Sequence, residues 1–588
     1  MNRLFITFFF IYFTILASAQ SKTLWSKLSD TSVSVLDGQA WSNEIGNSIQ
    51  RLPARAEKFI DKHNWDLSHQ SSGLSIRFLS NAPEIIVRYK VTSPINYESM
   101  LSTGVSGVDL FALDTDGMWR WAGGKSSFKD TIQYVFAKLR PNDSFHKLGR
   151  EYRLYLPLYN HVSNLEIGVP DTCLFKILPQ RLEKPIVMYG ATMIQGGSVS
   201  RPGMALSNIL SRKLDRTVVN LGFSNSFDLD EGIINIINEI DARIYVLDCF
   251  TNNKSLMNDS ILFQKRIFET VKTIRSKHPN TPILFTEAAG YTDNYLIPEP
   301  QTIFNNSNKF LNEAIENLNK EGVNGLYLLT NKQTGIDDAS TIDGINLNDI
   351  GIMRYATAFE NKIREIFNEP VGELKTQMPI PQRRTPASFD WEFRHKTMLK
   401  LNKTEPNKVL LIGNSITHNW GGNFSAKQTP NGDIWQKYLA PYGVRNMGFG
   451  ADRIENVLWR VYHDEIDGIN PEKIILSMGT NNLRVNTNEE IVEGLRFLLQ
   501  AIRLHQPNAK ITLLAIYPRR DQEERIIIIN KAIHAMAKSI KVKFEDIGKG
   551  LLQKDGKINE TLFNDGLHPK TAGYEILGKK LEAIIKKN

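Results

Sequence analysis

Four side chains in the C-terminal third of the chain have the types and the order needed for nucleophilic attack on an ester. Ser415 follows an apolar run, and Asp565 and His568 stand three residues apart near the C-terminus. An imidazole can take the proton of a serine hydroxyl, and a carboxylate can hold the imidazole and stabilise its cationic form. Asn481 also follows an apolar run and can donate an amide N–H to an oxyanion. The pattern predicts a Ser415–His568–Asp565 triad.

The elements that must position these residues are buried strands alternating with helices. Residues 409–412, 473–476 and 511–516 are apolar runs typical of a parallel sheet that is covered on both faces. Such a sheet presents ligand-binding residues at the carboxyl ends of its strands. Ser415 follows the first of these strands at a helix start, where backbone N–H groups have no intrahelical partner. Residues 405–588 are therefore predicted to form one α/β unit with its site at that edge.

Residues 181–368 look like a diverged copy of this unit. Thr192 and Asn346 are 154 residues apart in this region, and Ser415 and His568 are 153 residues apart. A fixed spacing of matching positions is the signature of an internal repeat. We call this region the first copy and the region of Ser415 the second copy. The strands predicted in the first copy are residues 186–189, 243–247, 283–285 and 325–329.

The remaining parts of the chain differ in pattern from the two copies. Residues 20–180 contain short alternating segments, of which 74–78, 84–90 and 152–156 suit half-buried strands. Because no long helical period separates them, we predict an antiparallel β-sandwich. Residues 369–404 begin with several prolines among polar residues and are predicted to be a linker.

The first 19 residues have the features of a signal peptide. A short basic start precedes a 13-residue apolar run, Leu4 to Leu16, and the small residues Ala17, Ser18 and Ala19 follow. Thirteen residues are too few to cross a bilayer as a helix, and Gln20 stands where a lipoprotein needs Cys. We therefore expect a secreted or periplasmic protein without a membrane span.

Composition restricts the partners and cofactors. The 588-residue chain carries a formal net charge of +8 that is spread along its length, whereas a nucleic-acid groove needs a basic stripe, so we expect no nucleic-acid partner. Two cysteines, Cys173 and Cys249, cannot build a disulfide framework or a zinc site by themselves. We expect no metal and no cofactor, because no metal-ligand spacing and no phosphate loop is present. The sequence leaves the oligomeric state open.

Four segments of the second copy resemble the four blocks of SGNH (GDSL-type) hydrolases, namely residues 413–417, 448–452, 479–482 and 565–569. Residues 456–460 are similar to the platelet-activating-factor acetylhydrolase-like branch. The resemblance implies a flavodoxin-like three-layer α/β/α fold in which Ser415 is the nucleophile. It also implies an oxyanion hole made by the Ser415 N–H, the block-two N–H and the Asn481 side chain. The block-two residue is Ala451 where the family has Gly, and Ala keeps the backbone donor if its φ is negative.

The first copy also resembles an SGNH domain, of a branch that follows an N-terminal β-sandwich. The segments that carry this resemblance are residues 195–197 and 200–205, with residues 107–111 and 119–121 in the sandwich. Thr192, Asn225 and Asn346 stand where the family has the nucleophilic Ser, the block-two Gly and the His; Asn252 and Asp343 are retained. An amide cannot accept the hydroxyl proton, so we predict that the first copy is catalytically silent.

These observations predict an exported serine esterase, specifically an O-acetylesterase acting on an acetylated complex carbohydrate. Export and the additional surface of the sandwich and the first copy favour a polymeric sugar substrate. Two alternatives stay open on the sequence: an esterase for short-chain lipid or platelet-activating-factor-like acyl esters, and a glycan-binding protein without turnover.

Overall fold

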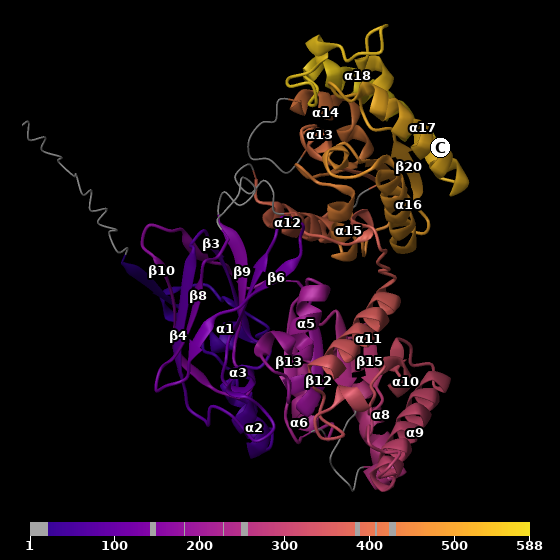
Figure 1. Cartoon of the computed structure of the whole chain (residues 1–588). Coiled ribbons are helices and arrows are strands. Elements are labelled where there is room, and N and C mark those ends of the chain that lie inside the picture. Colours follow the sequence, from indigo (N-terminus) through magenta and orange to yellow (C-terminus); the bar gives the residue numbers. More distant parts are fainter. Residues whose placement is uncertain are drawn as a thin grey trace, which may run out of the picture.

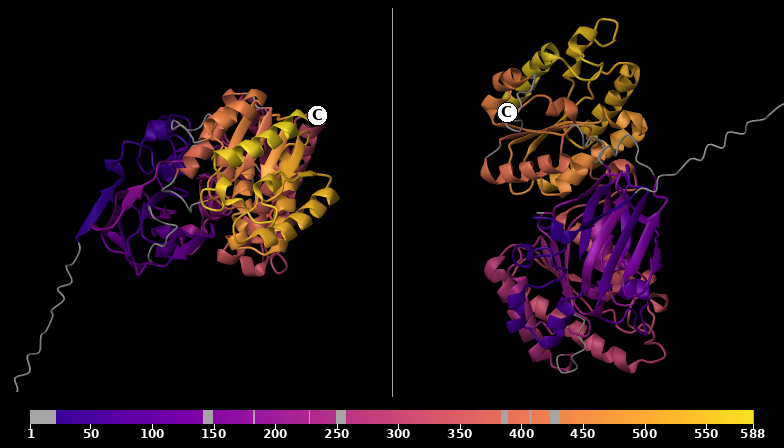
Figure 2. Two further views of the ribbon diagram at one scale, coloured as in Figure 1. Left: turned by 90° about the horizontal axis from the view of Figure 1, so that it is seen from above. Right: turned by 90° about the vertical axis from the view of Figure 1, so that its left-hand side faces the viewer.

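The computed structural model describes residues 22–140, 149–181, 183–226, 228–248, 257–382, 389–405, 408–422 and 431–587. These residues form an antiparallel β-sandwich and two α/β units, each with its own parallel sheet (Figure 1). Figures 1 and 2 show the sandwich and the first copy side by side, with the second copy above them. The predicted signal peptide, residues 1–19, lies outside the described residues.

The sandwich is made of two sheets with the strand orders β1-β10-β4-β8-β7 and β11-β3-β9-β5-β6, and β2 pairs with β3. Its strands alternate between buried and more exposed positions, as Ile85, Val87 and Tyr89 of β4 show. This confirms the predicted antiparallel sandwich. The strands are β1 (Thr23–Lys27), β2 (Leu36–Asp37), β3 (Ser75–Ser80), β4 (Glu84–Val91), β5 (Asp109–Leu113), β6 (Trp119–Ala122), β7 (Lys125–Ser127), β8 (Ile132–Ala137), β9 (Arg150–Tyr155), β10 (Val162–Pro170) and β11 (Phe175–Ile177).

Both copies contain a five-stranded parallel sheet with the same order, β13-β12-β14-β15-β16 in the first and β18-β17-β19-β20-β21 in the second. This is the flavodoxin-like order, with the first strand at the topological switch point. The first copy uses β12 (Ile186–Gly190), β13 (Val218–Gly222), β14 (Ile244–Asp248), β15 (Ile283–Thr286) and β16 (Leu326–Leu329). The second uses β17 (Val409–Gly413), β18 (Val444–Gly448), β19 (Lys473–Ser477), β20 (Lys510–Leu514) and β21 (Lys543–Glu545).

Helices cover both faces of each parallel sheet, which confirms the three-layer prediction. In the second copy, Leu410 and Ile412 of β17 pack into a core with α12, α15, α16 and α17, whereas Val409 and Leu411 pack with α14 and α18. The described helices of the two copies and of the segment between them that have at least seven residues are α5 (Leu206–Lys213), α6 (Glu231–Ile237), α8 (Ser260–Lys277), α9 (Glu299–Lys320), α11 (Asp349–Phe367), α12 (Trp391–Thr404), α14 (Gly432–Tyr438), α15 (Ile454–Tyr462), α16 (Asn488–His505), α17 (Glu523–Ser539) and α18 (Thr571–Lys586).

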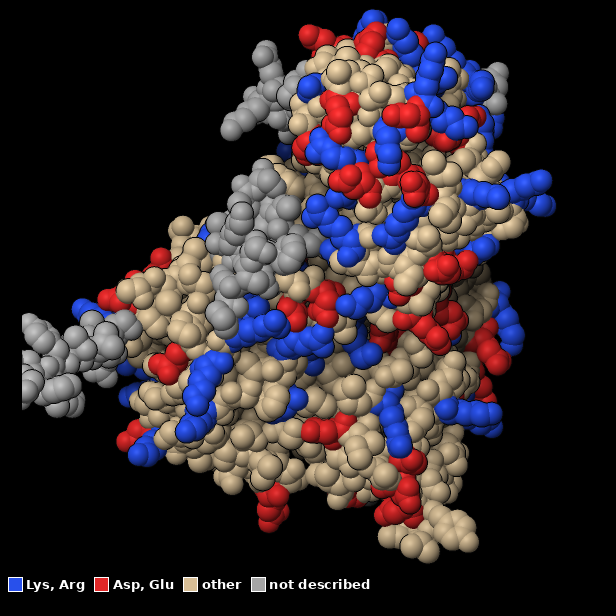
Figure 3. Space-filling model, turned by 45° about the horizontal axis from the view of Figure 1, so that its top comes forward, with Lys and Arg blue, Asp and Glu red and all other residues tan. Residues whose placement is uncertain are grey.

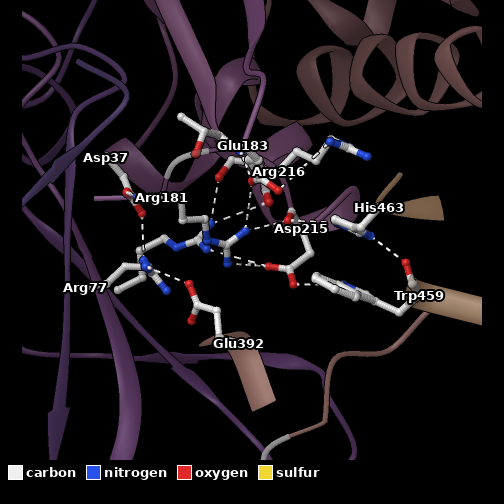
Figure 4. Close-up of polar contacts among 12 residues, drawn as sticks. Asp37, Arg77, Arg181, Glu183, Asp215, Arg216, Glu392, Trp459 and His463 are labelled. Atoms are coloured by element: carbon white, nitrogen blue, oxygen red, sulfur yellow. Dashed lines mark hydrogen bonds and ion pairs between the residues drawn. The ribbon is translucent and has the colours of Figure 1, made fainter. Parts of the chain in front are cut away.

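Polar side chains join the three parts of the molecule where they meet (Figure 4). Asp215 of the first copy accepts hydrogen bonds from Arg181 at 2.7 Å and from the indole N–H of Trp459, in α15, at 3.0 Å. Arg77 of β3 lies 3.7 Å from Glu392 in α12. The predicted linker thus contains a helix that contacts the sandwich and packs on the core of the second copy.

The surface mixes charges of both signs. On the face shown in Figure 3, Lys and Arg side chains are interspersed with Asp and Glu side chains. Some of the lysines pair with a carboxylate on the same helix, as Lys586 does with Glu582 at 2.9 Å. Among the described helices, none has the length and apolar character required to cross a membrane.

Candidate active site

The structure brings Ser415, His568 and Asp565 together. Ser415 is the first residue of α13 (Ser415–His418), directly after β17, and the other two lie on the turn before α18. The distance from Ser415 Oγ to His568 Nε2 is 2.9 Å, and that from His568 Nδ1 to Asp565 Oδ2 is 2.7 Å. A carboxylate only accepts, so His568 Nδ1 carries the proton and Nε2 is free to accept one from Ser415.

The turn that aims His568 is organised by Asp565. Its Oδ1 accepts hydrogen bonds from the backbone N–H of Leu567 at 3.0 Å and of His568 at 2.7 Å. Burial acts to raise the pKa of Asp565, but these two N–H groups and the His568 imidazole outweigh it, and the pKa lies at about 2. Asp565 is therefore ionised over the whole range in which a histidine can act as a base.

The two predicted oxyanion-hole residues beyond Ser415 lie on adjoining segments. Asn481 Nδ2 donates to the carbonyl of Asp452 at 2.8 Å, next to Ala451, and an amide has a second N–H for another acceptor. The φ of Ala451 is +61°, so the condition of a negative φ is not met, but the backbone N–H is kept: in the first copy Asn225, at a φ of +60°, still donates its N–H to the residue at the nucleophile position. Ala is uncommon in this left-handed region, which explains why Gly suits the position.

In the first copy, Thr192 occupies the position of Ser415, at the start of α4 (Thr192–Gln195) directly after β12. Its hydroxyl lies 3.0 Å from the Ser224 hydroxyl and accepts a hydrogen bond from the Asn225 N–H at 3.3 Å. Asn225 has a φ of +60°, which matches that of Ala451. The hydrogen bond to Thr192 shows that the block-two donor, the Asn225 N–H, points at the nucleophile position in the first copy.

Asn346 makes the same contacts in the first copy as His568 makes in the second, but its side chain is a neutral amide. Its Nδ2 donates to Asp343 Oδ2 at 2.7 Å, and its backbone N–H donates to Asp343 Oδ1 at 2.7 Å. Within the described part of the chain, no hydrogen bond joins Thr192 to Asn346. The fifth predicted residue of this site, Asn252, lies outside the described residues.

Family models match three consecutive parts of the chain. Residues 183–364 and 411–576 match two models described as GDSL-like lipase/acylhydrolase, and residues 23–175 match the N-terminus of SGNH-hydrolase-type esterases. A Drosophila melanogaster relative, the platelet-activating factor acetylhydrolase IB subunit beta homolog, is 31% identical over 187 residues, which cover 31% of this chain and 79% of the relative.

The chain belongs to the GDSL-like lipase/acylhydrolase family. The human platelet-activating factor acetylhydrolase IB subunit alpha2 is 28% identical over 200 residues, which cover 33% of this chain and 83% of the relative. The crystal structure of a Bacteroides ovatus protein described as a GDSL-like lipase has a TM-score of 0.53 and 27% identity, covering 59% of this chain and 98% of that one.

Sequence reasoning missed a buried asparagine in each GDSL-like copy. Asn220 Nδ2 donates to the Ile194 carbonyl at 2.6 Å, and Asn446 Nδ2 donates to the Thr417 carbonyl at 2.9 Å. Each amide oxygen accepts the N–H of the glycine two residues later, at 2.9 Å. These contacts tie the strand of block two to the helix of the nucleophile position. The signal was the repeated pattern Asn-x-Gly-Phe at residues 220–223 and 446–449.

A second missed pair holds the block-two loop of each GDSL-like copy. Gln195 Oε1 accepts the Ser224 N–H at 2.7 Å, and His418 Nδ1 accepts the Gly450 N–H at 3.3 Å. Both side chains stand three residues after the nucleophile position. Burial, assisted by the nearby Arg394, lowers the pKa of His418 to about 3, so its imidazole is neutral and can accept as the Gln195 amide does.

An arginine caps the end of the block-two strand in both copies, and each comes from a different part of the molecule. Arg51, in the sandwich, donates to the Gly222 carbonyl at 2.6 Å, and Arg394, in α12, donates to the Gly448 carbonyl at 2.8 Å. Burial lowers the pKa of Arg51 to about 9 and that of Arg394 to about 10. Segments outside both copies therefore help to shape the two sites.

Proposed function

We propose that this protein is an exported serine O-acetylesterase that removes acetyl groups from a complex carbohydrate at the site of Ser415. The observation that carries the proposal is the continuous hydrogen-bonded series Ser415–His568–Asp565, with 2.9 and 2.7 Å between successive side chains. These distances allow proton transfer without rearrangement of the free protein.

In the first half of the reaction, Ser415 Oγ attacks the acetyl carbonyl carbon while its proton passes to His568 Nε2. The negative charge moves to the carbonyl oxygen, and Asp565 stabilises the imidazolium. The carbon–oxygen bond to the sugar then breaks, and the imidazolium gives its proton to the departing sugar oxygen. The products of this half are a free sugar hydroxyl and an acetyl group on Ser415.

In the second half, His568 takes a proton from water, which attacks the acetyl carbonyl. The tetrahedral intermediate collapses with return of the proton to Ser415 Oγ, and acetate leaves. In both halves we assign the oxyanion to the Ser415 N–H, the Ala451 N–H and the second N–H of Asn481. Donors fixed in advance, as Asn481 is by its bond to the Asp452 carbonyl, stabilise developing charge without reorganisation.

The first copy has no part in turnover under this proposal. The Thr192 hydroxyl contacts Ser224 and Asn225. The amide of Asn346 has no basic nitrogen that could accept the Thr192 proton. Thr192 therefore stays a neutral alcohol, which is a weak nucleophile.

The choice of an acetyl ester of a carbohydrate rests on two supports. Relatives that match a third of the chain are named acetylhydrolases, which favours a short acyl group. The predicted signal peptide, together with the sandwich and the first copy, favours an extracellular polymer over a small lipid.

The test is acetate release from a panel of acetylated polysaccharides, with a series of 4-nitrophenyl esters from acetyl to octanoyl measured in parallel. We expect release from at least one polysaccharide and a steep fall in kcat/KM beyond acetyl. Equal rates on long chains would favour a lipid esterase. If the wild-type protein bound a polysaccharide but hydrolysed none of these esters, a glycan-binding protein without turnover would be the correct description.

A further inference from the structure

Three arginines follow the carboxyl ends of three neighbouring strands in the second copy. Arg453 follows β18, Arg484 ends the turn after β19, and Arg519 follows β20. The carboxyl ends of parallel strands meet at one edge of the sheet, which is also the edge that carries Ser415. The arginines therefore lie along the border of the candidate active site.

A hydrogen bond places Arg519 beside the segment that carries Asn481, and Arg484 follows Asn481 closely in the chain. Arg519 Nη1 donates to the Thr480 carbonyl at 3.2 Å, and Arg484 is three residues after Asn481. Burial lowers the pKa of Arg519, the Arg484 guanidinium lowers it further, and the Asp565 carboxylate opposes both. The Arg484 guanidinium also lowers the pKa of Arg453. Arg484 thus lies within electrostatic range of both other arginines.

Carboxylates neutralise only part of this cluster. Arg453 lies 3.8 Å from Glu455, which itself accepts a hydrogen bond from Asn482 at 3.0 Å. Among the residues that the structure describes, no carboxylate lies within 4.0 Å of the guanidinium of Arg484 or Arg519. Neighbouring like charges without counter-charges raise the local potential and attract an anion.

We propose that the substrate of the Ser415 site is the acetyl ester of an anionic sugar, a uronate, whose carboxylate is held by Arg484 and Arg519. This rests on the function proposed above and narrows its substrate class. A guanidinium presents parallel N–H donors that match the two oxygens of a carboxylate, and the half-buried position of Arg519 strengthens the pair. The contact positions the sugar, whereas proton transfer stays with His568.

The experiment compares acetylated polygalacturonate with acetylated xylan, a neutral polymer, for the wild type and two variants. Arg484→Gln removes the exposed cation of the cluster. Arg496→Gln is the matched control, because it removes the same charge from α16, where Arg496 already pairs with Glu493 at 3.0 Å. A second pair of substrates, 4-acetoxybenzoate and its neutral methyl ester, reports on charge without a sugar.

We expect Arg484→Gln to lower kcat/KM on acetylated polygalacturonate about tenfold, mainly through KM, and to leave acetylated xylan within about twofold. Raising NaCl from about 50 to about 500 mM should slow the wild type on the anionic polymer only. Arg496→Gln should behave as wild type. Equal losses on both polymers, or a wild type that prefers the neutral polymer at low salt, would overturn the proposal.

The two proposals fail in different ways. If neither polymer releases acetate but Ser415 still hydrolyses both benzoate substrates, the carbohydrate assignment is wrong. The arginine site is then judged by whether the anionic benzoate is preferred and whether Arg484→Gln removes that preference.

Discussion

In the first copy the amide of Asn346 donates to Asp343, and in the second the imidazole of His568 contacts Asp565 in the same way, at 2.7 Å in both. Arginines from outside the copies cap equivalent carbonyls, and the block-two residues share a φ near +60°. The bonds that shape the site thus join backbone, amide, carboxylate and guanidinium groups and do not need a base. A site of this fold can lose its chemistry and keep its shape.

The largest effect is expected when the second copy is given the residue of the first. His568→Asn keeps a donor for Asp565 but removes the base, so we expect kcat on 4-nitrophenyl acetate to fall by about 10⁵-fold while thermal stability is unchanged. The matched change in the other copy, Asn346→Ala, should leave kcat at the wild-type value. A loss of activity in Asn346→Ala would show that the first copy contributes to turnover.

A smaller loss is expected from the third oxyanion donor. Asn481→Ala removes an N–H from the proposed oxyanion hole and should lower kcat by about 10²- to 10³-fold with little change in KM. Asn252→Ala makes the equivalent change in the first copy and should have no effect. If Asn481→Ala raised KM and spared kcat, Asn481 would bind substrate rather than stabilise the transition state.

An effect of intermediate size is expected at His418, which accepts a backbone N–H of the block-two loop as Gln195 does in the first copy. His418→Gln installs the residue of the first copy and keeps an acceptor for the Gly450 N–H, whereas His418→Leu leaves that N–H without one. We expect activity within about twofold of wild type for His418→Gln and about a tenfold loss of kcat for His418→Leu.

The pH dependence of these variants separates this positioning role from catalysis. With a pKa of about 3, His418 is neutral from pH 4 upward, so wild type and His418→Gln should share one pH–rate profile over that range. A profile that changed with His418→Gln would mean that His418 itself exchanges protons during turnover.

The smallest effect concerns the left-handed backbone of block two. Ala451 has a φ of +61°, so Ala451→Gly should raise the free energy of unfolding by up to about 1 kcal/mol and leave kcat unchanged. Asn tolerates this conformation better than Ala, so Asn225→Gly should stabilise less. Chemical denaturation of both variants provides the comparison, and destabilisation by Ala451→Gly would contradict it.

The sequence predicted the central strands because a covered parallel strand is a continuous apolar run, as in residues 409–412. Among the strands of the two parallel sheets, it missed β13, β18 and β21. The β18 strand contains Arg445 and Asn446, whose polar groups are satisfied by partners distant in sequence, and β21 has three residues, two of them charged. Such partners are set by tertiary packing and leave no local pattern.

The candidate site was predictable to the extent that its residues follow strands in a fixed order. That order placed Ser415, Asn481 and His568 at one edge of one sheet. Arg394 was not predictable, because its partner is the backbone carbonyl of Gly448 and a carbonyl carries no sequence signature. The prolines near residue 370 also concealed α12, which begins only at Trp391.

Covalent labelling tests the asymmetry of the two copies most directly. Intact-protein mass is measured after reaction with excess diisopropyl fluorophosphate, and the modified residue is located by peptide mapping. Of the two nucleophile positions, Ser415 has a base at its hydroxyl and Thr192 does not, so we predict a single adduct per chain on Ser415 and none in Ser415→Ala. An adduct on Thr192, or labelling that persists in Ser415→Ala, would contradict the account.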